Sequence, residues 1–261
     1  MKKLSVILLI TTTITSCTLF FPKIALKRAG IFDTKSELKI IENEKQKIIF
    51  IGMHHFGREK FYNDVANKID SLQKLNYTVF YESVAKDKGT DSLIAIRNFK
   101  KLRKLMGFNP IKYLDTTNNK INGKIKYRGK HKLINQPKYS KLKVNNLTSI
   151  KADISITELI TEFEKNNGKI KLDSCDLKTN LTDKNYKCKK AKKSLLREFK
   201  MGYIGAYREK HLAERITKSN KNKVLVIYGA AHFWGLYFKL NEFDKTYRLT
   251  KYKTTYNTVH N

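Results

Sequence analysis

Two continuous apolar runs constrain the fold of this chain more than any other feature. Residues 47–52 read Lys-Ile-Ile-Phe-Ile-Gly, and residues 223–229 read Lys-Val-Leu-Val-Ile-Tyr-Gly. Short apolar runs that stop at a turn residue are typical of buried strands. Residues 77–81 predict a third strand, which ends immediately before Glu82.

Amphipathic segments separate these strands. Residues 58–75 and 91–106 carry apolar side chains at helical spacing. A strand, a helix and a second strand joined by short connections form a right-handed crossover with parallel strands. We therefore expect an α/β fold, in which helices flank a mixed, largely parallel sheet. We expect a functional site at the carboxyl ends of the strands.

The remaining segments give weaker signals. Residues 155–166 predict a helix that Ser155 caps, with Glu158 completing a capping box, and that Gly168 ends. Further predictions are a hairpin around Gly123, a strand at 169–172, one long helix or two over 189–219, a helix at 233–240 and an edge strand at 246–256.

The N-terminus has the pattern of a secretory signal. Two lysines precede the apolar stretch 4–10, and residues 14–17 read Ile-Thr-Ser-Cys, which resembles a bacterial lipobox. That resemblance makes Cys17 the lipidated first residue of the mature chain. The alternative is an uncleaved anchor, but six Ser or Thr residues dilute its hydrophobicity. We expect an exported lipoprotein, anchored in the membrane of a bacterial cell envelope.

The expected organisation is therefore a signal peptide over 1–17, a tether over 18–45 and one α/β domain over 46–261. Cys175 and Cys188 remain once Cys17 is set aside, and exported chains oxidise such pairs. We expect a disulfide between them. A two-cysteine metal site is the competing interpretation, although no second pair of ligands stands nearby in the sequence.

A formal net charge of +31 first suggests a nucleic-acid partner. The basic residues are spread along the chain, however, and the densest run, 112–143, has no recognisable nucleic-acid-binding pattern. A basic surface also suits an anionic membrane. We expect a solvated basic surface and no nucleic-acid partner, with polyanion binding through 112–143 as the alternative.

Each of the three predicted strands is followed by residues that can carry chemistry. His54 and His55 follow the first, Glu82 follows the second, and His232 stands three residues after Gly229. At one edge of a parallel sheet these side chains can converge. Two neutral imidazoles and a carboxylate can bind a divalent metal and leave room for a water that the metal acidifies. The alternative is that each histidine is a structural hydrogen-bonding residue.

The same segments resemble the TraB/PrgY/GumN family, which includes the Tiki membrane-tethered proteases. The resemblance rests on two Gly-x-x-His motifs, at 52–55 and 229–232, and on Glu82 between them. It covers about 46–240, includes the middle region near Asp153, and is thin between 107 and 145.

The family resemblance implies a metal-dependent hydrolase, with Mn²⁺ or Co²⁺ favoured and Zn²⁺ also compatible. Carried over, His55, Glu82 and His232 are metal ligands, or one of them is the base that activates water. A family arginine matches Arg208, which would hold a substrate carboxylate or a developing oxyanion; a surface arginine is the alternative. His54 stands outside the motif and is either an extra ligand or directed away from the site.

Two functions are consistent with these features. The first is an exported, lipid-anchored hydrolase of amide bonds in peptides, or of ester bonds. The second is a non-catalytic cell-surface protein that binds or sequesters a peptide or an acidic ligand. The basic surface favours the second function, and so does the PrgY branch of the family, which is associated with sequestering a peptide signal.

Overall fold

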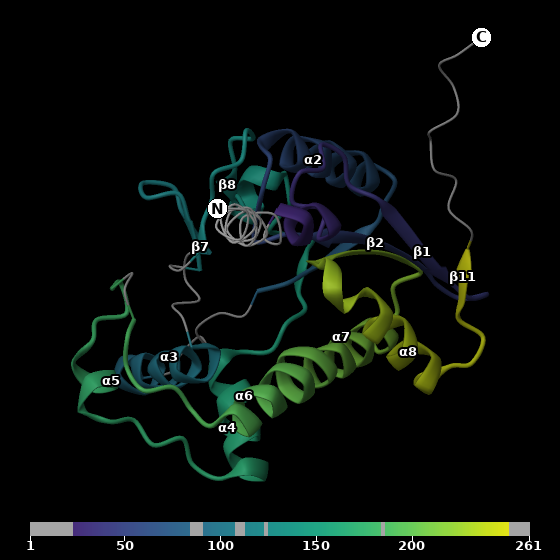
Figure 1. Cartoon of the computed structure of the whole chain (residues 1–261). Helices are drawn as coiled ribbons and strands as arrows, with labels where there is room; N and C mark the ends of the chain where they lie inside the picture. The colour runs from purple at the N-terminus through teal and green to yellow at the C-terminus, as the bar shows by residue number, and fades with distance from the viewer. Residues whose placement is uncertain (1–22, 84–90, 108–112, 123–124, 184–185, 251–261) are drawn as a thin grey trace, which may run out of the picture.

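The computed structural model describes residues 23–83, 91–107, 113–122, 125–183 and 186–250. In these ranges the chain forms a six-stranded sheet in the order β11-β1-β2-β10-β4-β9, with helices on both faces (Figure 1). The predicted α/β class is confirmed. None of the helices in these ranges is long and apolar enough to cross a membrane.

Four neighbouring strands of the sheet run parallel. They are β2 (Lys47–Met53), β10 (Lys223–Gly229), β4 (Thr78–Tyr81) and β9 (Ile150–Lys151). The interior positions of β2 and β10 are buried on both faces, as continuous apolar runs predict. All four strands end at the same edge of the sheet, so the residues that follow them can lie close together.

The strand β1 (Leu38–Glu42) corrects the predicted domain boundary. The sequence predicts a tether over 18–45, but β1 pairs antiparallel with β2, and β11 (Arg248–Thr250) pairs with its other side. The prediction fails because Ile41 is fully buried in the core, and residues 23–28 are already helical. The folded domain therefore includes residues before 46. Residues 1–22, including Cys17 and the predicted signal, lie outside the described residues.

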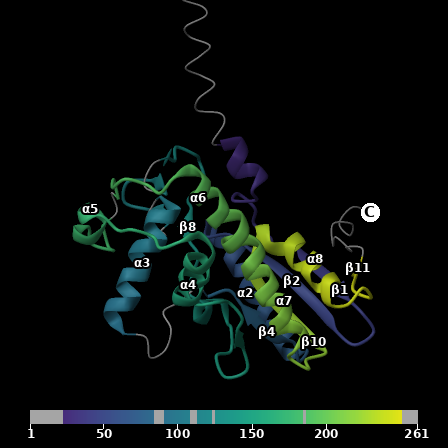
Figure 2. The same cartoon turned by 90° about the horizontal axis from the view of Figure 1, so that it is seen from below.

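Helices cover the two faces of the sheet with separate cores (Figure 2). On one face α2 (Glu59–Lys74) packs Val65 and Ile69 against β2 and β10. On the other face lie α7 (Arg208–Thr217) and α8 (Phe233–Phe243), which contribute Leu212 and Leu236. Each fully buried aliphatic side chain of this kind contributes about 1.5–3 kcal/mol.

A third cluster lies on the side of the molecule away from β1 and β11 (Figure 1). It joins α3 (Ser92–Met106), α4 (Ile156–Asn167) and α6 (Lys193–Glu198) around Phe163 and Phe199. The predicted start and end of α4 are confirmed, because the Ser155 hydroxyl accepts a hydrogen bond from the backbone N–H of Glu158 and Gly168 ends the helix.

Within the segment 189–219, residues 193–217 form one helical run with an irregular centre. Between α6 and α7 lies the π-helical segment η2 (Phe199–Tyr207), which contains Gly202 and Gly205. Insertions of π-helix are common near functional sites because they redirect the side chains that follow. Here the next residue is Arg208.

The predicted disulfide joins Cys175, in α5 (Ser174–Lys178), to Cys188, with a Cα–Cα distance of 5.7 Å. The strand predicted at 169–172 is absent, because this segment connects α4 to α5 without a sheet partner. Gly123 and residues 251–256 of the predicted edge strand lie outside the described residues. Two small sheets consist of short strands: β3 (Phe56–Gly57) with β8 (Ile134–Asn135), and β5 (Leu114–Asp115), β6 (Lys120–Ile121) and β7 (Ile125–Lys126).

Candidate active site at the carboxyl ends of the strands

The parallel strands bring three of the predicted site residues to one edge of the sheet. Glu82 follows β4 directly, and its backbone N–H continues the ladder by donating to the carbonyl of Ile227 on β10 (2.9 Å). His232 ends the single 3₁₀ turn η3 (Ala230–His232) after β10. His55 follows β2.

Arg208 is the hydrogen-bonding centre of this edge. Its guanidinium donates to Glu82 Oε1 (2.7 Å), and its Nε and Nη2 atoms donate to the two carboxylate oxygens of Asp153 (2.9 and 2.6 Å). The Tyr228 hydroxyl donates to the same Asp153 Oδ1 (2.6 Å). Only 4% of the Arg208 side chain is exposed. A buried arginine between two carboxylates fixes the positions of both groups.

Electrostatics keep Glu82 ionised. Burial alone would raise the pKa of its carboxyl, but the attraction and hydrogen bond of Arg208 outweigh burial and hold the pKa below its usual range. Its second oxygen, Oε2, accepts the backbone N–H of Gly229 (2.6 Å). Burial would likewise lower the pKa of Arg208, and the charge of Glu82 more than reverses this. The pair is therefore charged at neutral pH.

His232 is oriented by a carboxylate that the sequence analysis did not single out. Its Nδ1 lies 3.0 Å from Glu209 Oε1, and the ring is largely buried. Because an ionised carboxylate only accepts hydrogen bonds, this contact selects the tautomer of the neutral ring that has the hydrogen on Nδ1 and a lone pair on Nε2. A fixed tautomer of this kind is a feature of histidines that act as bases or metal ligands.

Two glycines leave room for the side chains of this centre. A Cβ at Gly229 would stand 3.3 Å from Glu82 Oε2 and 3.9 Å from His232 Nε2, so both groups border the same small volume. A Cβ at Gly235, in α8, would stand only 1.9 Å from Glu209 Oε2. The absence of a side chain at Gly235 thus leaves the space in which the Glu209 carboxylate lies.

His55, which follows β2, is an exposed residue. Its ring stacks on Tyr113 with centroids 3.9 Å apart. Desolvation lowers the pKa of His55, Arg208 and His232 add to this effect, and Glu82 opposes it. The charges of Glu82, Arg208 and His232 all act on His55, which lies in their vicinity.

His54 is directed away from the site. Its ring lies 5.0 Å from that of Phe61 and beside Gly30, while its backbone carbonyl accepts the Tyr62 hydroxyl (2.8 Å). Of the two possibilities that the sequence left open, the structure supports a position outside the candidate centre. The side chains of successive residues in an extended segment point in opposite directions, which accounts for the difference from His55.

Asp153, Tyr228 and Glu209 complete the centre, and sequence reasoning assigned them no role. Asp153 follows β9, which has two residues and no detectable periodicity. Tyr228 ends the apolar run of β10, and Glu209 stands next to the predicted Arg208. The sequence signal that could have identified these residues was their position next to predicted site residues. Their contacts themselves depend on the tertiary structure.

The three predicted metal ligands are not arranged as a metal site. No group of three or more His, Cys, Asp or Glu side chains among the described residues is placed to hold a metal ion. Both oxygens of Glu82 already accept hydrogen bonds, and the positive Arg208 guanidinium lies 2.7 Å from one of them. The arrangement fits a charged hydrogen-bonding centre better than a metal-binding one.

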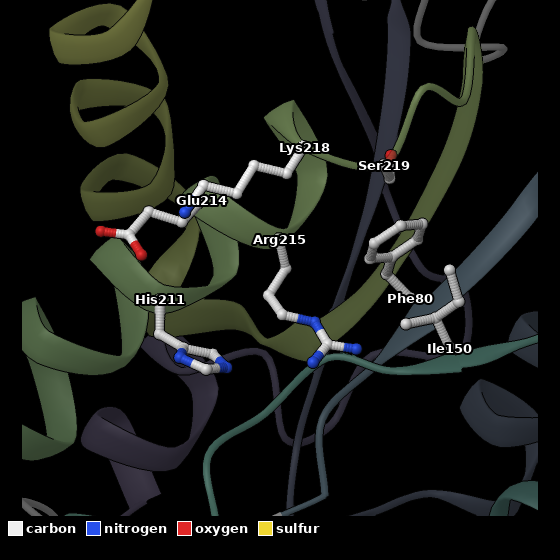
Figure 3. Close-up of a pocket in the computed structure, with 7 residues that line it drawn as sticks. All are labelled: Phe80, Ile150, His211, Glu214, Arg215, Lys218 and Ser219. Carbon is white, nitrogen blue, oxygen red and sulfur yellow. The ribbon is translucent and has the colours of Figure 1, made fainter.

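A separate cavity of about 420 Å³ lies beside α7 (Figure 3). Its lining comes from α7 and the following turn, and from Phe80 and Ile150 on β4 and β9. It includes His211, one helical turn after Arg208, but none of Glu82, His232 and His55. The cavity is therefore distinct from the candidate site.

Comparison of the chain with protein-family models, with curated proteins and with solved structures finds no match.

Proposed function

We propose that this chain is an exported, lipid-anchored hydrolase of peptide amide or ester bonds, with its reacting centre at Glu82, His232 and His55. The supporting observation is that two contacts, each between a carboxylate and a basic side chain, lie at the carboxyl ends of the strands. Arg208 positions Glu82, and Glu209 positions His232. The Glu209 carboxylate on Nδ1 leaves Nε2 of His232, which borders the small volume beside Gly229, as the nitrogen that can react.

In the proposed reaction, His232 acts as the general base. Its unprotonated Nε2 takes a proton from a water molecule, and the hydroxide attacks the substrate carbonyl. The imidazolium, stabilised by Glu209, then returns the proton to the departing amine or alkoxide as the carbon–nitrogen or carbon–oxygen bond breaks. Arg208 already donates hydrogen bonds to Glu82 and Asp153. We therefore assign it a positioning role, in place of the substrate-binding role that the family resemblance implies.

Metal dependence on Mn²⁺, Co²⁺ or Zn²⁺ stays a prediction of the family resemblance. Among the described residues, His55, Glu82 and His232 do not form a group of ligands for a metal ion. A bound ion would lower the pKa of its water. No step of the reaction above depends on it.

The test uses residues 17–261 with Cys17→Ser, which retain every described residue. Hydrolysis of a fluorogenic peptide and ester library is measured together with calorimetric titration of the three metals. Loss of turnover in His232→Ala and Glu82→Gln, with turnover retained in the control His211→Ala, supports the proposal. No turnover of any substrate, with or without metal, contradicts it.

A second candidate is a binding protein without turnover. The closed Arg208 network favours it, because a centre whose charges are already paired can position a ligand without reacting with it. In that case a peptide ligand binds and is recovered intact after long incubation, and His232→Ala weakens binding instead of abolishing a reaction.

A further inference from the structure

The cavity beside α7 has a cationic wall and an apolar wall. His211, Arg215 and Lys218 line it from α7 and the turn that follows, and their spacing of four and three residues places them on one face of the helix. Ile150 and Phe80 line it from the edge strand β9 and from β4. Figure 3 shows the Arg215 side chain extending from α7 toward Ile150. The volume of about 420 Å³ lies within the roughly 300–1,000 Å³ that is typical of small-molecule sites.

His211 has a buried ring nitrogen that the protein leaves without a partner. Within the described part of the chain, its Nε2 neither donates nor accepts a hydrogen bond. Its Nδ1 lies 4.0 Å from Glu158 Oε1, which is too far for a hydrogen bond. Burial lowers the pKa of His211, so the ring is neutral at neutral pH. Buried polar atoms are nearly always hydrogen-bonded. Because His211 lines the cavity, an occupant of the cavity can supply the missing partner.

Two cations of the cavity wall are available to a ligand. The Lys218 ammonium has no ion pair or hydrogen bond among the described residues. Arg215 is exposed, and its side chain donates one hydrogen bond, from Nη2 to the carbonyl of Lys151 (3.3 Å), which leaves most of its donors free. Glu214 is the acidic residue of the lining, and its carboxylate lies 4.0 Å from the ammonium of Lys210, outside the lining. The cavity therefore has an excess of positive charge.

Capping of α7 does not account for these two cations. Basic side chains near the end of a helix can donate hydrogen bonds to its last carbonyls. Here the hydroxyls of Thr217 and Ser219 donate to carbonyls of the last turn, at distances of 2.7 to 3.1 Å. Among the described residues, the side chains of Arg215 and Lys218 make no hydrogen bond to these carbonyls. Their charges are directed to the cavity instead.

We propose that this cavity binds a small organic acid with an apolar body. The carboxylate of the acid contacts Arg215 and Lys218, and His211 Nε2 hydrogen-bonds to the polar end of the same molecule. Guanidinium and carboxylate groups form strong, directional hydrogen bonds. The apolar body packs on Ile150. A single inorganic anion would leave most of the cavity unfilled and the apolar wall in contact with water, so burial of apolar surface favours the organic acid.

The site is separate from Glu82 and His232, so the proposal does not depend on the proposed hydrolysis. It is nevertheless built on the same elements as the candidate centre. Phe80 lies on β4 two residues before Glu82, and His211 lies on α7 three residues after Arg208. An occupant of the cavity therefore lies against both elements that position the Arg208–Glu82 pair.

NMR titration of ¹⁵N-labelled protein tests the site. Residues 17–261 with Cys17→Ser are titrated with phenylacetate and with 4-methylpentanoate while the imidazole nitrogen signals are followed, and His211→Gln assigns those of His211. We expect both acids to cause saturable shifts of the His211 signals. Phenylacetamide has the shape of phenylacetate without its charge. It should bind about tenfold more weakly, because it lacks the charged hydrogen bonds.

Two variants and a matched control localise the binding. Arg215→Gln and Lys218→Gln should each weaken phenylacetate binding about tenfold, since each removes one cation from the carboxylate. Both residues are exposed, so neither variant should unfold the protein, and thermal unfolding checks this. Lys239→Gln removes the same charge from the neighbouring helix α8, where Lys239 pairs with Glu242 and does not line the cavity. Its binding should equal that of the parent chain.

Three results would overturn the proposal. The first is the absence of any shift of the His211 signals with either acid. The second is equal weakening by Lys218→Gln and Lys239→Gln, which indicates general attraction to a basic protein. The third is inorganic phosphate that shifts the His211 signals at the same concentration as phenylacetate or a lower one, which shows that the apolar wall contributes nothing to binding.

Discussion

Two buried arginines, Arg103 and Arg208, stabilise different regions of this molecule in different ways. Arg103 is fully buried in α3 and donates to three backbone carbonyls, of Asp176 (3.2 Å), Thr179 (3.1 Å) and Asn180 (2.8 Å). Arg208 instead donates to two carboxylates that follow strand ends. Carbonyl oxygens do not titrate, whereas carboxylates do, so pH can change the contacts of Arg208 but not those of Arg103.

The residues that surround the two arginines also differ. Arg103 lies over the ring of Tyr186 in the loop that the Cys175–Cys188 disulfide closes, so it holds a segment of poor regular structure on the domain. Arg208 instead lies between the carboxylates of Glu82 and Asp153, near His232 and His55. Burial of an arginine therefore does not by itself identify a functional site. The groups that accept its hydrogen bonds indicate whether its role is structural or functional.

The largest expected effect comes from Arg103→Met. The substitution removes the donor of three backbone carbonyls, of which that of Asp176 is buried, and we expect the unfolding free energy to fall by about 3–5 kcal/mol. Denaturant unfolding measures this. Arg97→Met, on the exposed side of the same helix, is the control and should change stability little. Equal effects of the two variants would show that Arg103 is not the structural centre.

Removal of the disulfide is expected to cost less, about 3 kcal/mol in the chain-entropy account of a loop of this length. The double variant Cys175→Ser/Cys188→Ser is compared with the parent chain by thermal unfolding, with and without reductant. The parent should lose stability on reduction, and the double variant should not respond. Two free thiols in exported protein would contradict the predicted bridge.

Glu82→Gln tests the contact of Arg208 that pH can change. We expect a loss of about 2 kcal/mol at pH 7, because the variant replaces a charged hydrogen bond to Arg208. The native pKa of Glu82 is lowered, so its stabilising effect is present above the unfolded pKa. It disappears as the pH falls below about 4.3 and through the native pKa. Unfolding free energies of parent and variant should therefore converge in acid, and parallel curves would contradict the ion pair.

Gly235→Ala is expected to have the smallest effect on stability, because the higher helix propensity of alanine offsets local crowding. The new Cβ would displace the Glu209 carboxylate from His232. We expect the downfield NMR signal of the His232 Nδ1 proton to disappear, as it should in Glu209→Gln. Retention of that signal in Gly235→Ala would show that Glu209 adjusts without losing the contact.

The comparison also shows how far the sequence predicts the structure. The strands β2, β4 and β10 and the residues that follow them were predicted because apolar runs and glycines are local signals. Arg103 was not predicted, since its acceptors lie in a loop more than 70 residues away. The pairing of Asp153 with Arg208 depends on the position of β9, and that of Glu209 with His232 depends on the packing of α8 against α7. Neither arrangement has a local pattern.

The π-helical segment η2 sets the rotational phase of the helix that follows it. Successive α-helical residues differ by about 100° around the axis, so Arg208 and Glu209 face different directions, one toward Glu82 and the other toward His232. A deletion of one residue within 199–207 would turn both side chains together. Such a change would disconnect both halves of the centre at once, and it would also turn the core residue Leu212 of α7 away from its packing position.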